Sequence, residues 1–303
     1  MKKLLLRILL LALPFLVLVY VVGLYYAKGF NSQYIVKKRL LESAANQVQT
    51  LTLGSSHSYY GILPRFMDYG TFNLGHTSQS VYYDVELVLK FLPRLPKLNL
   101  VILPIDYFSL DAELDEGVER WRCYYYYYFY SIKHRDRSMA YDIRNFSAYF
   151  LYRQSPGSMA DVRDDFDSWG GFLEGSKRRD GVDFRKDALV AVKRHEGGNP
   201  ENALENLGSL ARLCLELKRR NIRLVLVTMP VTPYYRADVQ PARWARVQGL
   251  VEKFCHENNV SYKDYFSDGR FTLDDFFDAD HLNYNGAARL SEILAREVQH
   301  SVR

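Results

Sequence analysis

Short apolar runs alternate with longer amphipathic stretches along most of the chain. Residues 98–105 and 222–229 are nearly continuous apolar runs, which is typical of strands buried on both faces of a sheet. Three shorter β-prone runs lie at residues 48–53, 71–74 and 260–262. Apolar residues recur at helical spacing in four stretches, at residues 81–95, 203–220, 241–257 and 287–298. This alternation predicts an α/β domain with a mostly parallel sheet flanked by helices, a flavodoxin-like three-layer sandwich.

Two parts of the chain depart from this alternation. Residues 31–47 are polar and predict a linker ahead of a domain at residues 48–303. Residues 108–200 change from aromatic to charged to Gly- and Asp-rich, which predicts an insertion in that domain. Within the insertion, residues 124–130 are all aromatic. We expect this run to be a packed segment, and stacking on sugar rings or contact with a membrane interface is the alternative.

The first 30 residues have the pattern of a membrane segment. Residues 8–27 contain no charged side chain, and these 20 residues match the length that a helix needs to cross a bilayer. The run is longer than the apolar region of a secretory signal, roughly 7–15 residues, which favours an uncleaved transmembrane helix over a cleaved signal. Lys2, Lys3 and Arg7 precede the run. A short N-terminal tail kept inside the cell would place the domain outside the cytoplasm.

The net charge of +5 comes largely from this segment, whose 30 residues include four basic and no acidic side chains. The rest of the chain has 36 Lys and Arg against 35 Asp and Glu. A nearly neutral domain argues against nucleic acid as a partner. Cys123, Cys214 and Cys255 have no metal-binding spacing, so we expect buried free thiols, with one disulfide as the alternative.

A serine-rich turn follows the first predicted strand. Gly54-Ser55-Ser56-His57-Ser58 ends that strand with small side chains, among which a serine hydroxyl can be exposed beside backbone N–H groups. Ligands of parallel sheets bind beyond the carboxyl ends of the strands, where this turn is expected. Glycine and serine are also common in ordinary loops, so the turn alone does not establish a site.

A second candidate precedes the last predicted helix. Asp278 lies three residues before His281, so its carboxylate can accept the imidazole Nδ1–H and leave Nε2 to take a proton from a serine. A metal site of Asp278, Asp280 and His281 is an alternative, although no H-x-H, H-E-x-x-H or C-x-x-C pattern offers further ligands. A plain loop with Asn285 capping the helix is another alternative, and it is compatible with catalysis.

Together these segments resemble the SGNH (GDSL-type) hydrolase and acyltransferase superfamily. The resemblance covers residues 48–298 apart from the insertion: a Gly-x-Ser turn, an Asn-x-Gly loop, a buried third strand ending in a polar loop, and D-x-x-H before the final helix. Gly54-Ser55-Ser56 in place of Gly-Asp-Ser is similar to membrane-anchored proteins that modify cell-envelope polymers. Examples are the teichoic-acid D-alanyl transfer protein and relatives of alginate O-acetyltransferase.

The resemblance implies a catalytic triad. Ser56 matches the nucleophile, His281 the general base and Asp278 the residue that orients the base. Ser55 is the alternative nucleophile. The backbone N–H of Ser56 would supply one oxyanion donor. No metal and no cofactor are implied.

The resemblance also implies substrate-binding positions. Asn73 and Gly75 match the family's second loop, in which the oxyanion glycine falls on Ser78, and a backbone N–H survives that change. Asp106 stands where the family has an asparagine, and an ionised carboxylate there would repel an oxyanion. His57, next to Ser56, is a polar loop residue with no expected partner. It could line the site.

The expected mechanism is covalent, because Ser56 would attack an acyl carbonyl and a sugar hydroxyl or water would resolve the acyl-serine. We expect a single-pass protein of the cytoplasmic membrane whose domain faces the periplasm or cell exterior and O-acylates an envelope or secreted polysaccharide. The expected partners are the lipid bilayer, the polysaccharide or acyl-ester substrate, and a multi-spanning membrane acyltransferase. An esterase with the same triad and a non-catalytic protein that binds a glycan or a partner are the alternatives.

Overall fold

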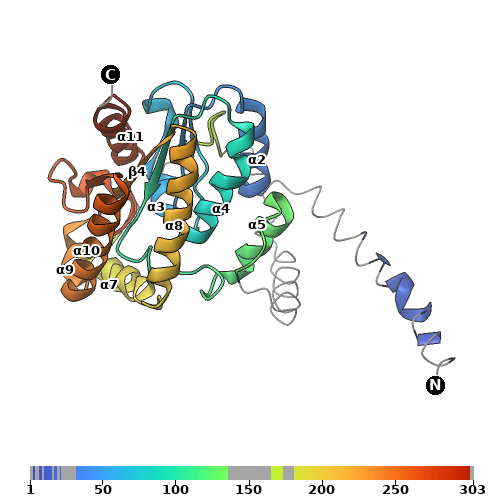
Figure 1. Cartoon of the computed structure of the whole chain (residues 1–303). Coiled ribbons are helices and arrows are strands. Elements are labelled where there is room, and N and C mark those ends of the chain that lie inside the picture. The colour runs from blue at the N-terminus through green and yellow to red at the C-terminus, as the bar shows by residue number, and fades with distance from the viewer. Residues whose placement is uncertain are drawn as a thin grey trace.

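A five-stranded parallel sheet forms the centre of the computed structural model (Figure 1). The structure describes residues 32–135, 165–172 and 181–300, and a few N-terminal residues: Lys3, Arg7, Ile8, residues 10–15, Val17, Leu18 and Val21. In their spatial order, the strands are β2 (Thr71–Asn73), β1 (Thr50–Thr52), β3 (Leu100–Pro104), β4 (Arg223–Thr228) and β5 (Ser261–Asp264). The order changes direction between β1 and β3, which is where parallel sheets bind ligands at the strands' carboxyl ends.

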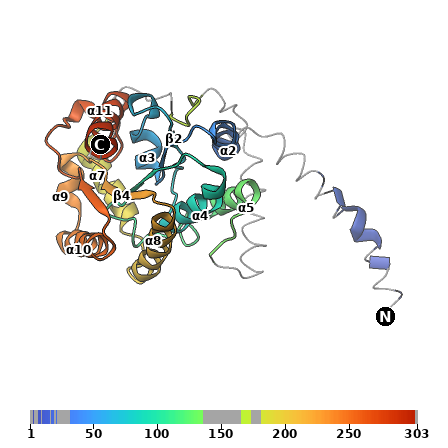
Figure 2. The same cartoon turned by 45° about the horizontal axis from the view of Figure 1, so that its top comes forward.

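Helices cover both faces of the sheet. They are α2 (Gln33–Ala44), α3 (Ser56–Gly61), α4 (Val81–Phe91), α5 (Cys123–Tyr130), α7 (Phe184–His195), α8 (Asn202–Arg219), α9 (Pro233–Asp238), α10 (Pro241–Asn258) and α11 (Tyr284–Leu294). Short 3₁₀ turns occupy Pro64–Phe66, Leu92–Arg94, Arg120–Arg122 and Leu273–Asp275, and a π-helical turn at Ala295–Gln299 follows α11. In Figure 2, α3 and α11 lie on one side of β4, and α4 and α8 lie on the other.

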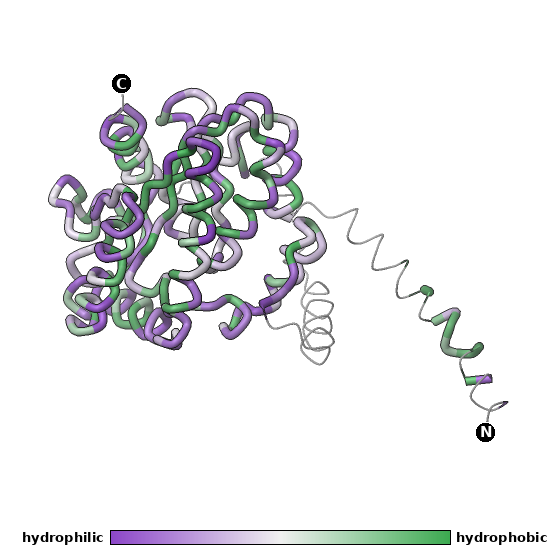
Figure 3. Tube along the Cα trace, viewed as in Figure 1, coloured by the Kyte–Doolittle hydropathy of each residue, from purple (hydrophilic) through white to green (hydrophobic). Residues whose placement is uncertain are grey.

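Alternation of side chains along β3 explains the two apolar layers. Val101 and Leu103 join a core with α2, α4, α5, α8 and α10, while Leu100 and Ile102 face α11. Successive side chains of a strand point to opposite faces, so a central strand must be apolar throughout. Figure 3 shows the resulting concentration of hydrophobic residues at the centre of the domain. The predicted α/β fold with a parallel sheet flanked by helices is confirmed.

The expected linker at residues 31–47 is wrong for most of its length, because Gln33–Ala44 forms α2 and packs on the domain. Tyr34, Leu41 and Ala44 are buried in the same core as α4 and α5. The basic triplet Lys37-Lys38-Arg39 interrupts the apolar pattern by which this helix could have been predicted. The side chain of Lys37 is nevertheless fully buried. The domain therefore begins before β1.

The aromatic run at residues 124–130 lies entirely in α5 and is a packed segment, as expected. The side chains of Tyr124, Tyr125, Tyr126, Phe129 and Tyr130 are buried, and only Tyr127 and Tyr128 are exposed. Tyr125 stacks on Tyr34 of α2 at 4.6 Å between ring centroids. The expected insertion thus contributes core residues here. Residues 136–164 and 173–180 of the insertion lie outside the described residues.

All three cysteines are buried and none forms a disulfide, so the alternative of a disulfide is wrong. The expected transmembrane helix at residues 8–27 lies largely outside the described residues. Within the part of the chain that the structure describes, we find no helix that combines the length and the apolar character needed to cross a bilayer.

Gly54, which follows β1 in the turn that precedes α3, should not tolerate a side chain. Its φ is +111°, and an added Cβ would lie 3.1 Å from both Pro104 and Ser58 side-chain atoms. We expect Gly54→Ala to lower the free energy of unfolding by about 1–3 kcal/mol, measured by denaturant titration. Gly208→Ala is the matched control, because Gly208 is exposed in α8 with no atom near an added Cβ, and alanine should stabilise that helix by about 1 kcal/mol. Equal effects at the two positions would contradict this account of the turn.

Candidate active site

The carboxyl ends of the strands bring the sequence candidates to one edge of the sheet. Ser56 and His57 follow β1, Asn73 ends β2 with Gly75 and Ser78 after it, and Asp106 follows β3. The loop that holds Asp278 and His281 precedes α11, which packs against α3. Residues from four separate segments can therefore meet above β1 and β3.

The turn before α3 presents the hydroxyl of Ser56 rather than that of Ser55. Ser55 is the N-cap of α3, and its buried Oγ accepts a hydrogen bond from the backbone N–H of His57. Ser56 is the first residue of the helix, so its own N–H has no intrahelical acceptor. The alternative that Ser55 faces the base is not supported by this geometry.

Ser56, His281 and Asp278 form a hydrogen-bonded chain. His281 Nε2 lies 2.8 Å from Ser56 Oγ, and His281 Nδ1 lies 2.9 Å from Asp278 Oδ1. Asp278 also accepts the backbone N–H of His281 at 2.9 Å, which fixes the carboxylate against the ring that it orients. This arrangement can take a proton from a serine hydroxyl and hold the imidazole in one tautomer. The three side chains are only partly buried, so a ligand can reach them.

The loop of Asp278 and His281 is held by a cap at Asn283, not at Asn285. Asn283 Oδ1 accepts the N–H of Gly286, and its Nδ2 donates to the carbonyls of Asp274 and Phe276. Asparagine is a favoured N-cap because its side-chain oxygen satisfies an N–H of the first turn. The cap is compatible with catalysis because it leaves Asp278 and His281 free to face Ser56.

The sequence context of His57 suggests a loop residue without partners, but in the structure His57 lies in α3 and has two. Its ring is buried between two carboxylates, with Nδ1 at 2.9 Å from Asp106 Oδ2 and Nε2 at 3.4 Å from Asp280 Oδ2. Burial lowers the pKa of His57, but the two carboxylates outweigh burial and raise the pKa to about 10. His57 is therefore a buried cation at neutral pH.

Asp106 does not act as an oxyanion donor in this geometry. One of its oxygens faces His57, and the other accepts the backbone N–H of Met229 at 2.9 Å, just beyond β4. The carboxylate that appears in the place of the family's asparagine is thus used to hold His57. This pairing could not be predicted from a local pattern, because His57 and Asp106 are 49 positions apart.

Arg194 and His195 are site residues without a predicted role, and Asp280 was expected only as a ligand of the alternative metal site. Asp280 Oδ2 also lies 3.1 Å from an Arg194 guanidinium nitrogen and 3.6 Å from His195 Nε2. Burial raises the pKa of Asp280, but His281 and the hydrogen bond from His57 outweigh burial and hold the pKa well below its usual range. Arg194 and His195 end α7, inside the expected insertion, so only the fold brings them to this edge.

Asp84 of α4 holds the serine turn through a hydrogen bond to Gly54 and was not predicted from the sequence. Its Oδ1 accepts the backbone N–H of Gly54 at 2.8 Å and the side-chain amide of Gln79. Burial raises the pKa of Asp84 to about 7, against the lowering effect of both hydrogen bonds. A helical aspartate in an apolar stripe is the one sequence signal that could have identified it.

Hydrogen bonds hold the second loop, and two of its expected binding residues, Asn73 and Gly75, take part in them. Asn73 Nδ2 donates to the carbonyls of Ser58 and Ile62, and its Oδ1 accepts the N–H of Gly75. The N–H of Gly75 is therefore not directed at a ligand. Ser78 has a φ of +58°, a left-handed conformation that favours glycine.

Two groups of side chains are close enough to share a cation. Ligand atoms of His57, Asp280 and His281 lie within 4.8 Å of one another, as do those of Asp115, Cys123 and His134. In the first group each histidine already faces Ser56 or a carboxylate. In the second, Asp115 accepts hydrogen bonds from Tyr83, Cys123 and the backbone of Arg135. Hydrogen bonds therefore account for the first group and for Asp115 and Cys123 of the second.

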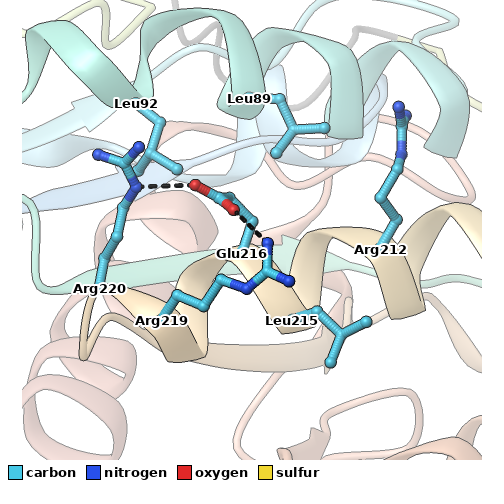
Figure 4. A pocket seen from close by; sticks show the side chains of 7 residues that line it. All are labelled: Leu89, Leu92, Arg212, Leu215, Glu216, Arg219 and Arg220. Carbon is cyan, nitrogen blue, oxygen red and sulfur yellow. Dashed lines mark hydrogen bonds and ion pairs between the residues drawn. The ribbon is translucent and has the colours of Figure 1, made fainter.

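A surface pocket between α4 and α8 lies apart from this edge of the sheet (Figure 4). Its lining residues are Leu89, Leu92, Arg212, Leu215, Glu216, Arg219 and Arg220. Glu216 pairs with Arg219 and Arg220, and Arg212 pairs with Glu86. The pocket contains no nucleophile beside a base, so the Ser56 region is the candidate active site.

Asp106→Asn should destabilise the protein, although it introduces the asparagine that the resemblance places at this position. Asparagine can still accept from Met229, but it removes a partner of the buried His57 cation, which costs about 3–5 kcal/mol. Because the pKa of His57 is raised to about 10, this stabilisation is complete below the unfolded value of roughly 6.5 and is lost as pH rises toward 10. Denaturant titrations should therefore show a difference from the native protein that shrinks over this range. Glu252→Gln, at an exposed position of α10, is the control, and a neutral or stabilising Asp106→Asn would contradict the pairing.

No family model matches the sequence, and no curated protein matches it. The structure is similar to a GDSL-like lipase from Bacteroides thetaiotaomicron, at 11% identity, covering 88% of this chain and 98% of the other, with a TM-score of 0.42. It is also similar to a lipase/acylhydrolase from Enterococcus faecalis, at 12% identity, 83% and 96% coverage and a TM-score of 0.40. A catalytic mutant of an acetylxylan esterase from Geobacillus stearothermophilus matches at 12% identity, 84% and 94% coverage and a TM-score of 0.37.

Proposed function

We propose that this protein is an SGNH-type serine enzyme that cleaves an acyl ester through an acyl-serine on Ser56. The observation that supports this proposal most directly is the chain of contacts from Ser56 Oγ to His281 and on to Asp278, at 2.8 Å and 2.9 Å. A nucleophile, a base and an orienting carboxylate in hydrogen-bond reach are the geometric requirement for acyl transfer by serine.

In the proposed reaction, Ser56 Oγ forms a bond to the acyl carbon while its proton passes to His281 Nε2. The carbonyl π electrons move onto the oxygen, which the backbone N–H groups of Ser56 and Ser78 would stabilise. The leaving alkoxide then takes the proton from His281 as the ester bond breaks. A second hydroxyl compound repeats these steps in reverse and releases Ser56 with the acyl group transferred.

We further propose that the acceptor is a polysaccharide hydroxyl and that the enzyme works outside the cytoplasm on a membrane anchor. The uncharged run at residues 8–27 supports an anchor, and its described side chains Leu11 and Phe15 are exposed by 80% and 66%. The Gly54-Ser55-Ser56 variant of the serine turn supports transfer, through its resemblance to envelope-modifying proteins. A multi-spanning membrane acyltransferase would supply the acyl group, and water as acceptor would make the protein an esterase.

The alternative of a non-catalytic binding protein loses its main support. That alternative rested on Asp106, whose charge would oppose an oxyanion. Because Asp106 faces His57 and the Met229 backbone, its charge is engaged within the protein. An acidic residue at this position is therefore compatible with acyl transfer.

Labelling of Ser56 by a serine-reactive fluorophosphonate tests the proposed chemistry. We expect mass spectrometry to find the adduct on Ser56, and both labelling and hydrolysis of an activated acetyl ester to fall by roughly 10²–10⁴ in His281→Ala. Ser55→Ala is the matched control, since it removes the adjacent hydroxyl and should retain most activity. Absence of labelling in the folded native protein, or labelling that persists in Ser56→Ala, would refute the proposal.

The proposed location predicts where a C-terminal reporter is active. A reporter that functions only in the periplasm, fused after Arg303, should be active and should fractionate with membranes. Removal of residues 1–30 should abolish both properties, because the same segment is proposed to export and to anchor the domain. Activity of a cytoplasm-dependent reporter at the same position would contradict the proposed topology.

A further inference from the structure

Two consecutive residues after β1 face two consecutive residues before α11. Ser56 Oγ lies 2.8 Å from His281 Nε2, and the next residue, His57, has its Nε2 3.4 Å from Asp280 Oδ2. The nucleophile turn and the base loop are therefore joined twice, at adjacent positions. The second contact is buried, since the side chains of His57 and Asp280 are only 2% and 3% exposed.

Both ring nitrogens of His57 face carboxylate oxygens. Because an ionised carboxylate only accepts hydrogen bonds, each nitrogen must donate, and only the imidazolium has two N–H groups. On its other side, Asp106 accepts the backbone N–H of Met229. The chain Asp106–His57–Asp280 thus ties the base loop to the carboxyl ends of β3 and β4.

Asp280 also acts on the base through its charge. Its Oδ1 lies 3.5 Å from His281 Nδ1, which already has Asp278 at 2.9 Å. A second uncompensated carboxylate would favour the protonated imidazole, which cannot accept a proton from serine. The His57 cation on the other oxygen of Asp280 opposes this effect.

Resting on the proposed function, we propose that His57 is a positioning residue. As a buried imidazolium between Asp106 and Asp280, it locks the Ser56 turn to the His281 loop and offsets the charge of Asp280 beside the base. This role goes beyond the triad, because His57 touches neither Ser56 Oγ nor the proton that His281 accepts.

The titratable groups around the pair come from several elements. Asp278 and His281 share the loop of Asp280, and Asp106 follows β3. Arg194 and His195 approach from α7, and His195 Nδ1 is 2.7 Å from the hydroxyl of Tyr235 in α9. Burial lowers the pKa of His195 well below its usual range, so this histidine is neutral. Besides His57, Arg194 is the other cation within 4 Å of Asp280 among the described residues, and its side chain is 55% exposed.

The pH dependence of kcat/KM for hydrolysis of an activated acetyl ester tests the proposal. His57→Gln leaves Asp280 without its buried cation, so the midpoint of the acid limb should move up by roughly one pH unit. Asp280→Asn removes the carboxylate, so the midpoint should move down. Loosening of the two loops should lower kcat in both variants by roughly 10²-fold, with a smaller change in KM. Opposite shifts are not expected of a merely structural role, and shifts in one direction, or none, would overturn the proposal.

The double variant and a remote pair serve as controls. His57→Gln combined with Asp280→Asn should return the midpoint toward that of the native enzyme, because neither charge remains. His300→Gln removes a half-exposed histidine that pairs with Asp68. Asp68 precedes β2 and so lies at the amino ends of the strands, away from the site, and this variant should leave the pH profile unchanged. A double variant that keeps the shift of either single variant would contradict the charge argument.

A measurement on the full-length native protein does not depend on activity. With ¹⁵N-labelled histidine, the ring nitrogens of His57 should both carry protons at about pH 8.5, between the ordinary value of roughly 6.5 and the raised pKa of about 10. Loss of these signals in His57→Gln assigns them. An unprotonated ring nitrogen would overturn the proposal even if Ser56 reacts with the fluorophosphonate. Absence of that reaction with His57 protonated would instead refute the proposed function and leave the His57 ion pairs in place.

Discussion

The hydrogen bond between Ser56 Oγ and His281 Nε2 joins residues that are 225 positions apart in the sequence. The rest of the site depends on how the fold keeps these two atoms in contact. Much of the surrounding structure fixes the loop of His281. Gly286 lies so close to Asp275 that an added Cβ would be 2.1 Å from its carbonyl oxygen, and Ser291 of α11 accepts the N–H of Leu63. Close packing of α11 on α3 thus sets the position of the base relative to the nucleophile.

Electrostatic balance is the second constraint on this edge of the sheet. Asp278, Asp280 and Asp106 bring three carboxylates around two histidines, and such a group is stable only if cations offset most of its charge. His57 and Arg194 supply those cations. The position of His57 directly after Ser56 means that the ion pair and the nucleophile are held by the same helical turn. Stability and the geometry of the site therefore depend on the same few side chains.

The sequence predicted the layers of this fold because burial on both faces leaves a clear pattern. Strands β3 and β4 are apolar throughout, and the local pair Asp278 and His281 has a spacing that one loop can satisfy. Helix α2 was missed because its buried lysine breaks the apolar pattern. The partners of His57 could not be predicted, since Asp106 and Asp280 lie 49 and 223 positions away and no local pattern records such contacts. Periodicity identifies elements and short loops, whereas ion pairs between loops depend on the strand order.

Lys37 connects helix α2, on the N-terminal side of the domain, to the loop that follows β2. Its Nζ donates to the carbonyl of Gly75 at 2.7 Å and lies 4.6 Å from the ring centre of Tyr59. Burial lowers the pKa of Lys37 well below its usual range, against a raising effect of Asp167. This contact couples α2 to the loop that contains Gly75 and Ser78, so α2 belongs to the same folded unit as the candidate site.

This coupling restricts where an anchored enzyme could work. If residues 8–27 span the membrane as proposed, only residues 28–32 connect them to α2, and five residues reach at most roughly 18 Å even when fully extended. The domain would then be confined to the membrane surface. A polysaccharide acceptor would have to approach that surface to be acylated. An acyl donor delivered by a membrane protein would already be there, which makes transfer beside such a partner geometrically simpler than action on a distant soluble ester.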